Sequence, residues 1–257
     1  RVDKTQYDSR HQELPAVYTN GEWYKLVSYI GTEPCTNGDV TELCTKENGL
    51  GWPWIGFRAT EGWAALVDDN NYGLGLYNHM TSEWIGGFAG DMGSGEEKDF
   101  PTGYISPLTI EIIDHDIVYD YDYTLIVGDL DSIRAYAVEN IQKDRADKFV
   151  FESDRQHFSY RGIQDAGLPI KGCLEFDYSA GSLVLGANQF FDGSKIKNIV
   201  LDAEFDKDVQ ACFNFTKYDG VYRDRYYQYP VQTFGFETKA GERQKYIIPV
   251  TTDEKFV

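Results

Sequence analysis

Apolar and polar positions alternate along much of the chain, most clearly from Ile113 to Val127. One parity of this stretch is apolar or aromatic, and the other carries aspartates and Thr124. A two-residue period is the side-chain period of a β-strand, so the pattern predicts a long strand with one packed face and one acidic face. The apolar parity consists of Ile113, Ile117, Tyr119, Tyr121, Tyr123, Leu125 and Val127, and the acidic parity includes Asp114, Asp116, Asp120 and Asp122.

Two patterns in the N-terminal part predict β-hairpins. In the first, residues 17–19 and 23–30 flank Asn20-Gly21, a dipeptide that accepts the positive φ angles of a type I′ turn. In the second, residues 63–67 and 72–77 flank a run of Asp and Asn.

The first strand of the second hairpin is apolar on both faces, which predicts a central position covered from both sides. Its partner strand carries Gly73 and Gly75 on one face, and these glycines leave room for another backbone, a side chain or a ligand.

The remaining segments predict one loop, one helix and a domain boundary. Residues 86–107 are rich in glycine and predict a long loop. Residues 129–142 predict a short helix, capped by Asp129 or Asp131, because apolar residues recur there at helical spacing. The charged run that follows separates an antiparallel β-sandwich over 1–147 from a jelly-roll or immunoglobulin-like β-sandwich over 148–257. The predicted fold class is therefore all-β.

The net charge argues against a nucleic-acid partner, and the short apolar runs argue against a membrane-spanning helix. The net charge is −18, from 42 acidic against 24 basic residues, and this opposes binding to a nucleic-acid phosphate backbone. No apolar run approaches the roughly 20 residues of a membrane-spanning helix. The chain starts without Met or a signal-like apolar segment, so we expect a processed chain or part of a longer one.

Cysteines and one sequon favour an extracellular location. By position, Cys35 pairs with Cys44 and Cys173 pairs with Cys212; parity places the second pair on polar strand faces. Asn214-Phe215-Thr216 is an N-glycosylation sequon whose asparagine is predicted to face outward. The alternative is four free thiols in a cytosolic protein.

Aromatic residues make up 15% of the chain and suggest a carbohydrate site. Tryptophan rings stack on sugar C–H faces, and neighbouring carboxylates accept hydrogen bonds from sugar hydroxyls. Alternatively, these rings fill the interior of a large β-sandwich. The candidate sugar-binding residues are Trp52, Trp54, Trp63 and Trp84.

Acid–base chemistry has four candidates: His11, Glu13, Glu61 and Tyr104. Paired carboxylates would suit a polysaccharide hydrolase, whereas a His or Tyr beside an Arg would suit a lyase. Alternatively, Glu13 and Glu61 are hydrogen-bonded surface residues, and the sequence leaves open whether the protein is an enzyme.

Calcium is the cofactor that the acidic composition favours. Asp68 and Asp69 lie in an Asp- and Asn-rich turn that could supply oxygen ligands, although solvated acidic surface is the simpler interpretation. The four histidines lack short ligand spacing, so the sequence gives little support to zinc.

Four strings resemble segments of large, secreted, largely uncharacterised proteins associated with carbohydrate. They are TQY (5–7), RHQELPAVY (10–18), TEGWAALVD (60–68) and PTGYI (101–105). In those proteins a mutarotase-like β-supersandwich precedes a carbohydrate-binding jelly roll. The resemblance covers about residues 1–140, implies a carbohydrate setting and transfers no catalytic residue. It also implies that part of the supersandwich is missing at the N-terminus.

The sequence thus predicts a secreted all-β protein that binds or processes extracellular polysaccharide. Its site is expected in the 52–63 and 84–107 segments, with His11 or Glu13 nearby. The alternative is a structural subunit of an extracellular matrix, adhesion layer or filament that self-associates through an exposed strand edge.

Overall fold

The computed structural model describes residues 11–46, 54–89, 102–112, 118–141, 148–161, 163, 165–177, 184–186, 193–216 and 231–250. These residues form two compact units, the first extending to Gly186 and the second running from Gly193 to Val250. No helix among them is long and apolar enough to span a bilayer.

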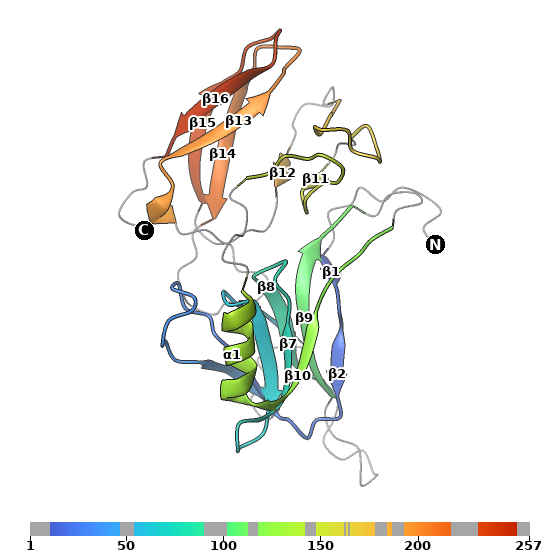
Figure 1. Cartoon of the computed structure of the whole chain (residues 1–257), viewed down its shortest axis with the longest axis vertical. Helices are drawn as coiled ribbons and strands as arrows, with labels where there is room; N and C mark the ends of the chain where they lie inside the picture. The colour runs from blue at the N-terminus through green and yellow to red at the C-terminus, as the bar shows by residue number, and fades with distance from the viewer. Residues whose placement is uncertain are drawn as a thin grey trace. The chain divides into compact units, whose positions relative to one another are not determined.

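The first unit is a β-sandwich with one helix (Figure 1). One five-stranded sheet has the order β1-β9-β8-β5, with β2 also paired to β9, and the other has the order β10-β7-β6-β3-β4. All these pairs are antiparallel. The strands are β1 (His11–Glu13), β2 (Val17–Thr19), β3 (Lys25–Ser28), β4 (Thr41–Thr45), β5 (Trp54–Arg58), β6 (Trp63–Val67), β7 (Tyr72–Tyr77), β8 (Glu83–Ala89), β9 (Thr102–Ile110) and β10 (Thr124–Asp129).

The main core lies between these two sheets. Leu26 and Leu66 of one sheet and Trp84 and Ile105 of the other are fully buried in a single apolar cluster. Strands β5 and β6 supply this cluster from alternate positions, Ile55 and Phe57 and then Ala64 and Leu66, as the period of two requires. The all-β fold class with one short helix is therefore confirmed.

Helix α1 (Leu130–Asn140) covers the outer face of the sheet that contains β6. Asp129 caps it by accepting a 2.8 Å hydrogen bond from the backbone N–H of Ser132. Ile133 and Ala137 are buried against Trp63 and other residues of that sheet. The predicted helix is confirmed, and its cap is Asp129.

The predicted β6–β7 hairpin is also confirmed, including its glycine face. All five residues of β6 are buried, so this strand is covered from both sides as its sequence indicated. A side chain at Gly75 would place Cβ 2.3 Å from Cγ2 of Ile133. The absence of a side chain at this position lets the helix approach the sheet.

The predicted hairpin between residues 17–19 and 23–30 is wrong. Strand β2 pairs with β9, whereas β3 pairs with β4 and β6 in the other sheet. Both Leu26 and Val27 are buried, so β3 has two covered faces and occupies the interior of its sheet. The Asn20-Gly21 segment therefore connects two sheets.

The predicted loop over 86–107 is wrong at both ends, because these ends belong to β8 and β9. Residues 90–101 lie outside the described part of the chain. A Cβ at Gly86 would meet the Tyr104 carbonyl oxygen at 2.9 Å and Leu26 Cδ2 at 3.0 Å. The glycine thus marks a close approach between the two sheets rather than a loop.

The predicted acidic strand is shorter than its sequence pattern. Strand β10 begins at Thr124, residues 118–123 are not in a described strand, and residues 113–117 are not described. Its apolar parity is not packed: Leu125 is 48% and Val127 is 59% exposed. The predicted packed face is therefore wrong for β10: Leu125 and Val127 meet solvent at the border of the sheet, whereas Ile126 of the other parity packs under α1.

The first unit also contains a short strand pair, β11 (Ser159–Arg161) with β12 (Val184–Gly186). Ile112, two residues after the end of β9, packs there with Tyr160 and Ile163. A buried ion pair between Arg155 and Asp165, with Nε and Oδ2 2.6 Å apart, fixes the surrounding loops.

The second unit contains two antiparallel strand pairs among its described residues. Strand β13 (Asn198–Ala203) pairs with β16 (Gln244–Pro249), and β14 (Gln210–Thr216) pairs with β15 (Val231–Glu237). A short 3-10 helix, η1 (Gly193–Lys195), precedes them. Phe236 and Tyr246 join the pairs, with ring centroids 5.9 Å apart.

The glycine–helix contact gives a stability prediction. We expect Gly75→Ala to lower the free energy of unfolding by about 2 kcal/mol, because the new methyl group overpacks against Ile133. Urea unfolding measures the loss. Gly128→Ala is the control, since its nearest neighbour would be 3.9 Å away. Equal effects of the two substitutions would contradict the close packing of α1.

Candidate functional site

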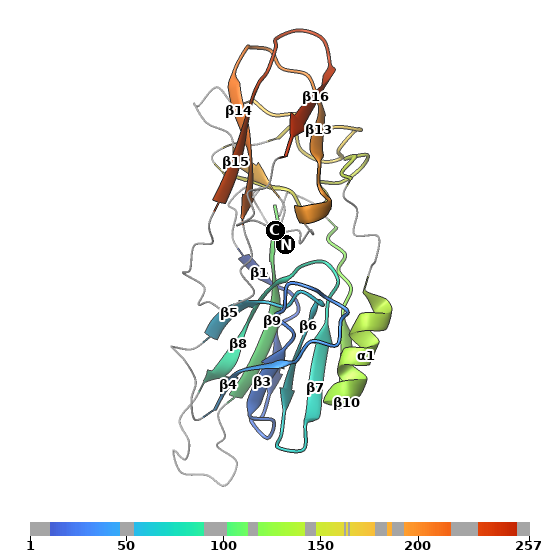
Figure 2. The ribbon, with the colours of Figure 1, turned by 90° about the vertical axis from the view of Figure 1, so that its left-hand side faces the viewer.

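The outer face of the β1-β9-β8-β5 sheet carries a lateral row of aromatic residues. Trp54 of β5 lies opposite Gly87 of β8, Gly87 opposite Tyr104 of β9, and Tyr104 opposite Tyr18 of β2. Figure 2 shows β5, β8 and β9 side by side in this sheet. Because neighbouring residues across a sheet share a face, all four positions point to the same side.

Gly87 brings the rings of this row together. The Trp54 and Tyr104 centroids are 4.4 Å apart although the strand of Gly87 lies between theirs. On the other side, Tyr18 and Tyr104 are 4.8 Å apart. Tyr104 is fully buried, whereas Tyr18 is 61% exposed and Trp54 is half-buried. The row therefore presents two accessible rings supported by a buried third.

Glu13 joins this aromatic row through Tyr104. The Tyr104 hydroxyl donates a hydrogen bond to Oε2 of Glu13, whose side chain is exposed. Burial is the main cause that raises the pKa of Tyr104, and the bond to Glu13 raises it further. The phenol thus stays protonated and orients the carboxylate.

The same face carries a second carboxylate near its other border. Glu83 of β8 pairs with Arg58 of β5, with Oε1 and Nη2 2.7 Å apart. Both Glu13 and Glu83 therefore already accept hydrogen bonds from protein donors. The face combines apolar rings with fixed polar groups, which is the composition of a site for a polyhydroxylated ligand.

Three of the residues predicted as site residues meet here: Glu13, Trp54 and Tyr104. His11 lies in the neighbouring β1, opposite Ile110. Trp52 lies outside the described residues. Sequence analysis did not name Tyr18 as a site residue. The signal that could have identified it is an aromatic residue in a predicted strand, five positions after the candidate Glu13.

Two of the predicted sugar-binding residues are core residues. Trp63 is fully buried under α1, and Trp84 is fully buried between the sheets. Neither ring is accessible to a ligand in this structure. For these two tryptophans the structure supports the alternative interpretation, in which the rings fill the interior.

Glu61 is fully buried and accepts hydrogen bonds from three residues. Arg134 of α1 binds both of its oxygens, at 2.9 and 3.0 Å. The Trp63 indole N–H donates at 2.9 Å, and the Cys35 backbone N–H donates at 3.0 Å. Because its donors come from α1, from β6 and from the loop before β4, Glu61 joins these three elements.

This network gives a second stability prediction. We expect Glu61→Gln to cost about 3 kcal/mol of unfolding free energy, because the amide would face donors only and the half-buried Arg134 would lose its counter-ion. The control is Asp69→Asn, whose carboxylate is 72% exposed and pairs with Lys25. Such a solvent-screened surface pair contributes little to stability. Similar urea midpoints for both variants would contradict the role of Glu61.

The candidate calcium ligands are engaged in local contacts. Asp68 accepts hydrogen bonds from the backbone N–H groups of Asn70 and Tyr72, at 2.8 and 3.0 Å, and Asp69 pairs with Lys25 at 2.7 Å. Backbone hydrogen bonds lower the pKa of Asp68. No three His, Cys, Asp or Glu side chains gather into a metal-binding group within the described ranges.

The expected disulfides are absent, because neither Cys35 and Cys44 nor Cys173 and Cys212 are joined in this structure. Cys44 points into the core, where burial raises its pKa to about 12, while Cys35 is exposed. Cys173 lies outside any strand, so strand parity does not apply to it. Cys212 and the sequon residue Asn214 are exposed on β14.

Sequence analysis missed a histidine–carboxylate pair. Nδ1 of His157 lies 2.5 Å from Oε1 of the buried Glu111, 46 positions away along the chain. Gln156 and His157 adopt positive φ angles of 46° and 61°, uncommon for non-glycine residues. The Gln156 side chain holds this turn by accepting hydrogen bonds from the backbone N–H groups of Val150 and Phe151.

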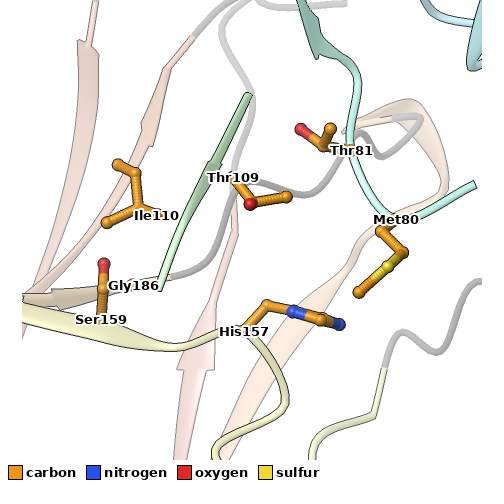
Figure 3. A pocket seen from close by; sticks show the side chains of 7 residues that line it. All are labelled: Met80, Thr81, Thr109, Ile110, His157, Ser159 and Gly186. Carbon is orange, nitrogen blue, oxygen red and sulfur yellow. The ribbon is translucent and has the colours of Figure 1, made fainter. Parts of the chain in front are cut away.

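His157 also lines a small cavity of about 20 Å³. Figure 3 shows its ring extending from the loop toward Met80, with Thr109 nearby. This volume suits about one water molecule. The cavity is lined by Met80, Thr81, Thr109, Ile110, His157, Ser159 and Gly186.

The contact between His157 and Glu111 attaches the loop around residue 157 to the segment that follows β9.

The His157–Glu111 pair gives a pH prediction. Burial lowers the pKa of His157, but the hydrogen bond and charges of Glu111 and Asp154 outweigh it, so the pKa rises above 6.5. The stabilisation is complete below pH 6.5 and is lost as pH rises through the raised pKa. Thermal unfolding from pH 6 to 9 should show this loss relative to His157→Gln. Parallel melting curves for both proteins would rule it out.

These features define an all-β sandwich protein with an aromatic and acidic sheet face. No family model matches the chain, and neither a curated protein nor a solved structure matches it. The resemblance to secreted supersandwich proteins stays a prediction.

Proposed function

We propose that this protein binds an extracellular polysaccharide on the outer face of the β1-β9-β8-β5 sheet. The observation that carries the proposal is the row of aromatic residues, in which Trp54 and Tyr18 pack against the buried Tyr104 beside Glu13. Exposed rings stack on sugar faces at little cost in side-chain entropy, because packing on one side already restricts them.

The hydrogen bonds at this face favour binding over cleavage. A glycosidase needs one protonated carboxyl group as general acid, whereas Glu13 accepts a hydrogen bond from the Tyr104 hydroxyl and Glu83 pairs with Arg58. A lyase needs a base, but the raised pKa of Tyr104 keeps its phenol protonated near neutral pH. We therefore expect this face to bind polysaccharide without cleaving it.

The proposed setting is extracellular. Asn214 is exposed on β14, as glycosylation of its sequon would require. This proposal of an extracellular setting rests on the sequon. Glycan release followed by a mass measurement on the natural protein would test it.

Binding should depend on the two accessible rings, Trp54 and Tyr18. We expect Trp54→Ala and Tyr18→Ala each to weaken polysaccharide binding about tenfold, since each removes a stacking surface. Affinity electrophoresis in xylan, mannan, β-glucan and alginate measures the loss, and a reducing-end assay should detect no product.

The matched control for this binding test is Tyr72→Ala, which removes a 47% exposed tyrosine from the other sheet. It should leave retardation unchanged, and circular dichroism should confirm that every variant is folded. Absence of retardation in all four gels, or equal losses in Tyr72→Ala and Tyr18→Ala, would refute the proposal.

A further inference from the structure

The border of the sheet that ends in β10 carries an exposed apolar stripe. We define the apolar stripe as Tyr121, Tyr123, Leu125 and Val127, which are 38%, 47%, 48% and 59% exposed. Ile126 points to the opposite face, where it packs with the cluster under α1. The stripe therefore continues the core face of the sheet beyond its covered part.

The backbone of β10 is open on one side among the described strands. Strand β10 ends its sheet and pairs only with β7 there (Figure 1). Its register places Thr124 opposite Tyr77, and the N–H of Leu130 donates to the Asn71 carbonyl at 2.8 Å. Hydrogen-bonded positions alternate along an antiparallel pair, so the N–H and C=O groups of Leu125 and Val127 point away from β7.

The segment before β10 has the side-chain spacing of a strand. The ring centroids of Tyr119 and Tyr121 are 6.1 Å apart, and those of Tyr121 and Tyr123 are 5.9 Å apart. Alternate residues of an extended chain are separated by about 6.6 Å. The stripe thus has the shape of one face of a strand that lacks a neighbour.

The negative charge beside the stripe favours a positively charged strand as the partner of β10. Asp120 and Asp122 alternate with the stripe, are exposed and form no ion pair with a described residue. A second copy pairing on this edge would bring further aspartates to it, and the whole chain carries −18. Like charges across a strand pair destabilise it, whereas Lys or Arg would stabilise it.

We propose that β10 binds an extended protein segment in which Lys or Arg alternates with apolar residues. The segment adds a strand to the sheet by hydrogen-bonding to the outward backbone groups of Leu125 and Val127. Its apolar side chains cover the stripe, and its cations pair with Asp120 and Asp122. This mode of recognition is β-strand addition, in which the backbone gives affinity and alternate side chains give specificity.

A labelled peptide of five Lys-Val repeats tests this proposal by fluorescence anisotropy on the full chain. It should bind saturably and more weakly at high salt, while Glu-Val and Lys-Ser repeats of the same length should not bind. Backbone amide NMR signals of residues 120–127 should shift on binding. Binding of Glu-Val repeats as strong as that of Lys-Val repeats would overturn the proposal.

Variants separate backbone pairing from apolar contact. Val127→Pro removes an outward N–H and keeps the ladder with β7, so we expect at least about tenfold weaker binding. Leu125→Ser with Val127→Thr should weaken binding similarly, and this pair decides the outcome if the proline variant does not fold. Asp120→Asn with Asp122→Asn should weaken binding and remove most of its salt dependence.

The matched control is Val200→Thr with Ile247→Thr, which alters an exposed cross-strand pair of β13 and β16. It should leave peptide binding unchanged, and an equal loss there would overturn the proposal. So would a dimer that disappears in Val127→Pro while the Lys-Val peptide fails to bind, because a second copy would then occupy β10.

Discussion

Strand β6 is buried on both faces, and this double burial organises the first unit. Ala64 and Leu66 point into the core between the sheets, while Trp63, Ala65 and Val67 point toward α1. A strand of this composition is stable only inside a sheet with a layer on each side. The opposite sheet supplies one layer and the helix supplies the other. The aromatic row and the apolar stripe therefore both lie on the outside of this packed core.

The sequence predicted the elements whose signals are local. The β6–β7 turn and the Asp129 cap each depend on residues within a few positions, and both were confirmed. Pairing partners are not local. The Asn20-Gly21 signal identified a turn but not that β3 would join a different sheet from β2. Gly86 was read as a loop residue because the side chain it makes room for, Leu26, is distant in the chain.

The candidate site was predicted residue by residue but not as an assembly. Glu13, Trp54 and Tyr104 were each named, yet their proximity depends on register across several strands. The sequence could not separate Trp54 from Trp84, since burial decides their roles and both lie in apolar strands. Glu111 and His157 belong to no motif and meet only through the docking of a distant loop.

The buried carboxylate of Glu61 also constrains how the protein can be made. Its guanidinium partner, Arg134, follows 73 positions later in the chain. At about 5–20 residues per second, a ribosome would need roughly 4 to 15 s to add that stretch. For this interval β6 has been synthesised without its cover, and the nascent chain exposes Trp63 and an unneutralised glutamate. The sandwich around β6 therefore acquires its second layer only after the ribosome has added α1.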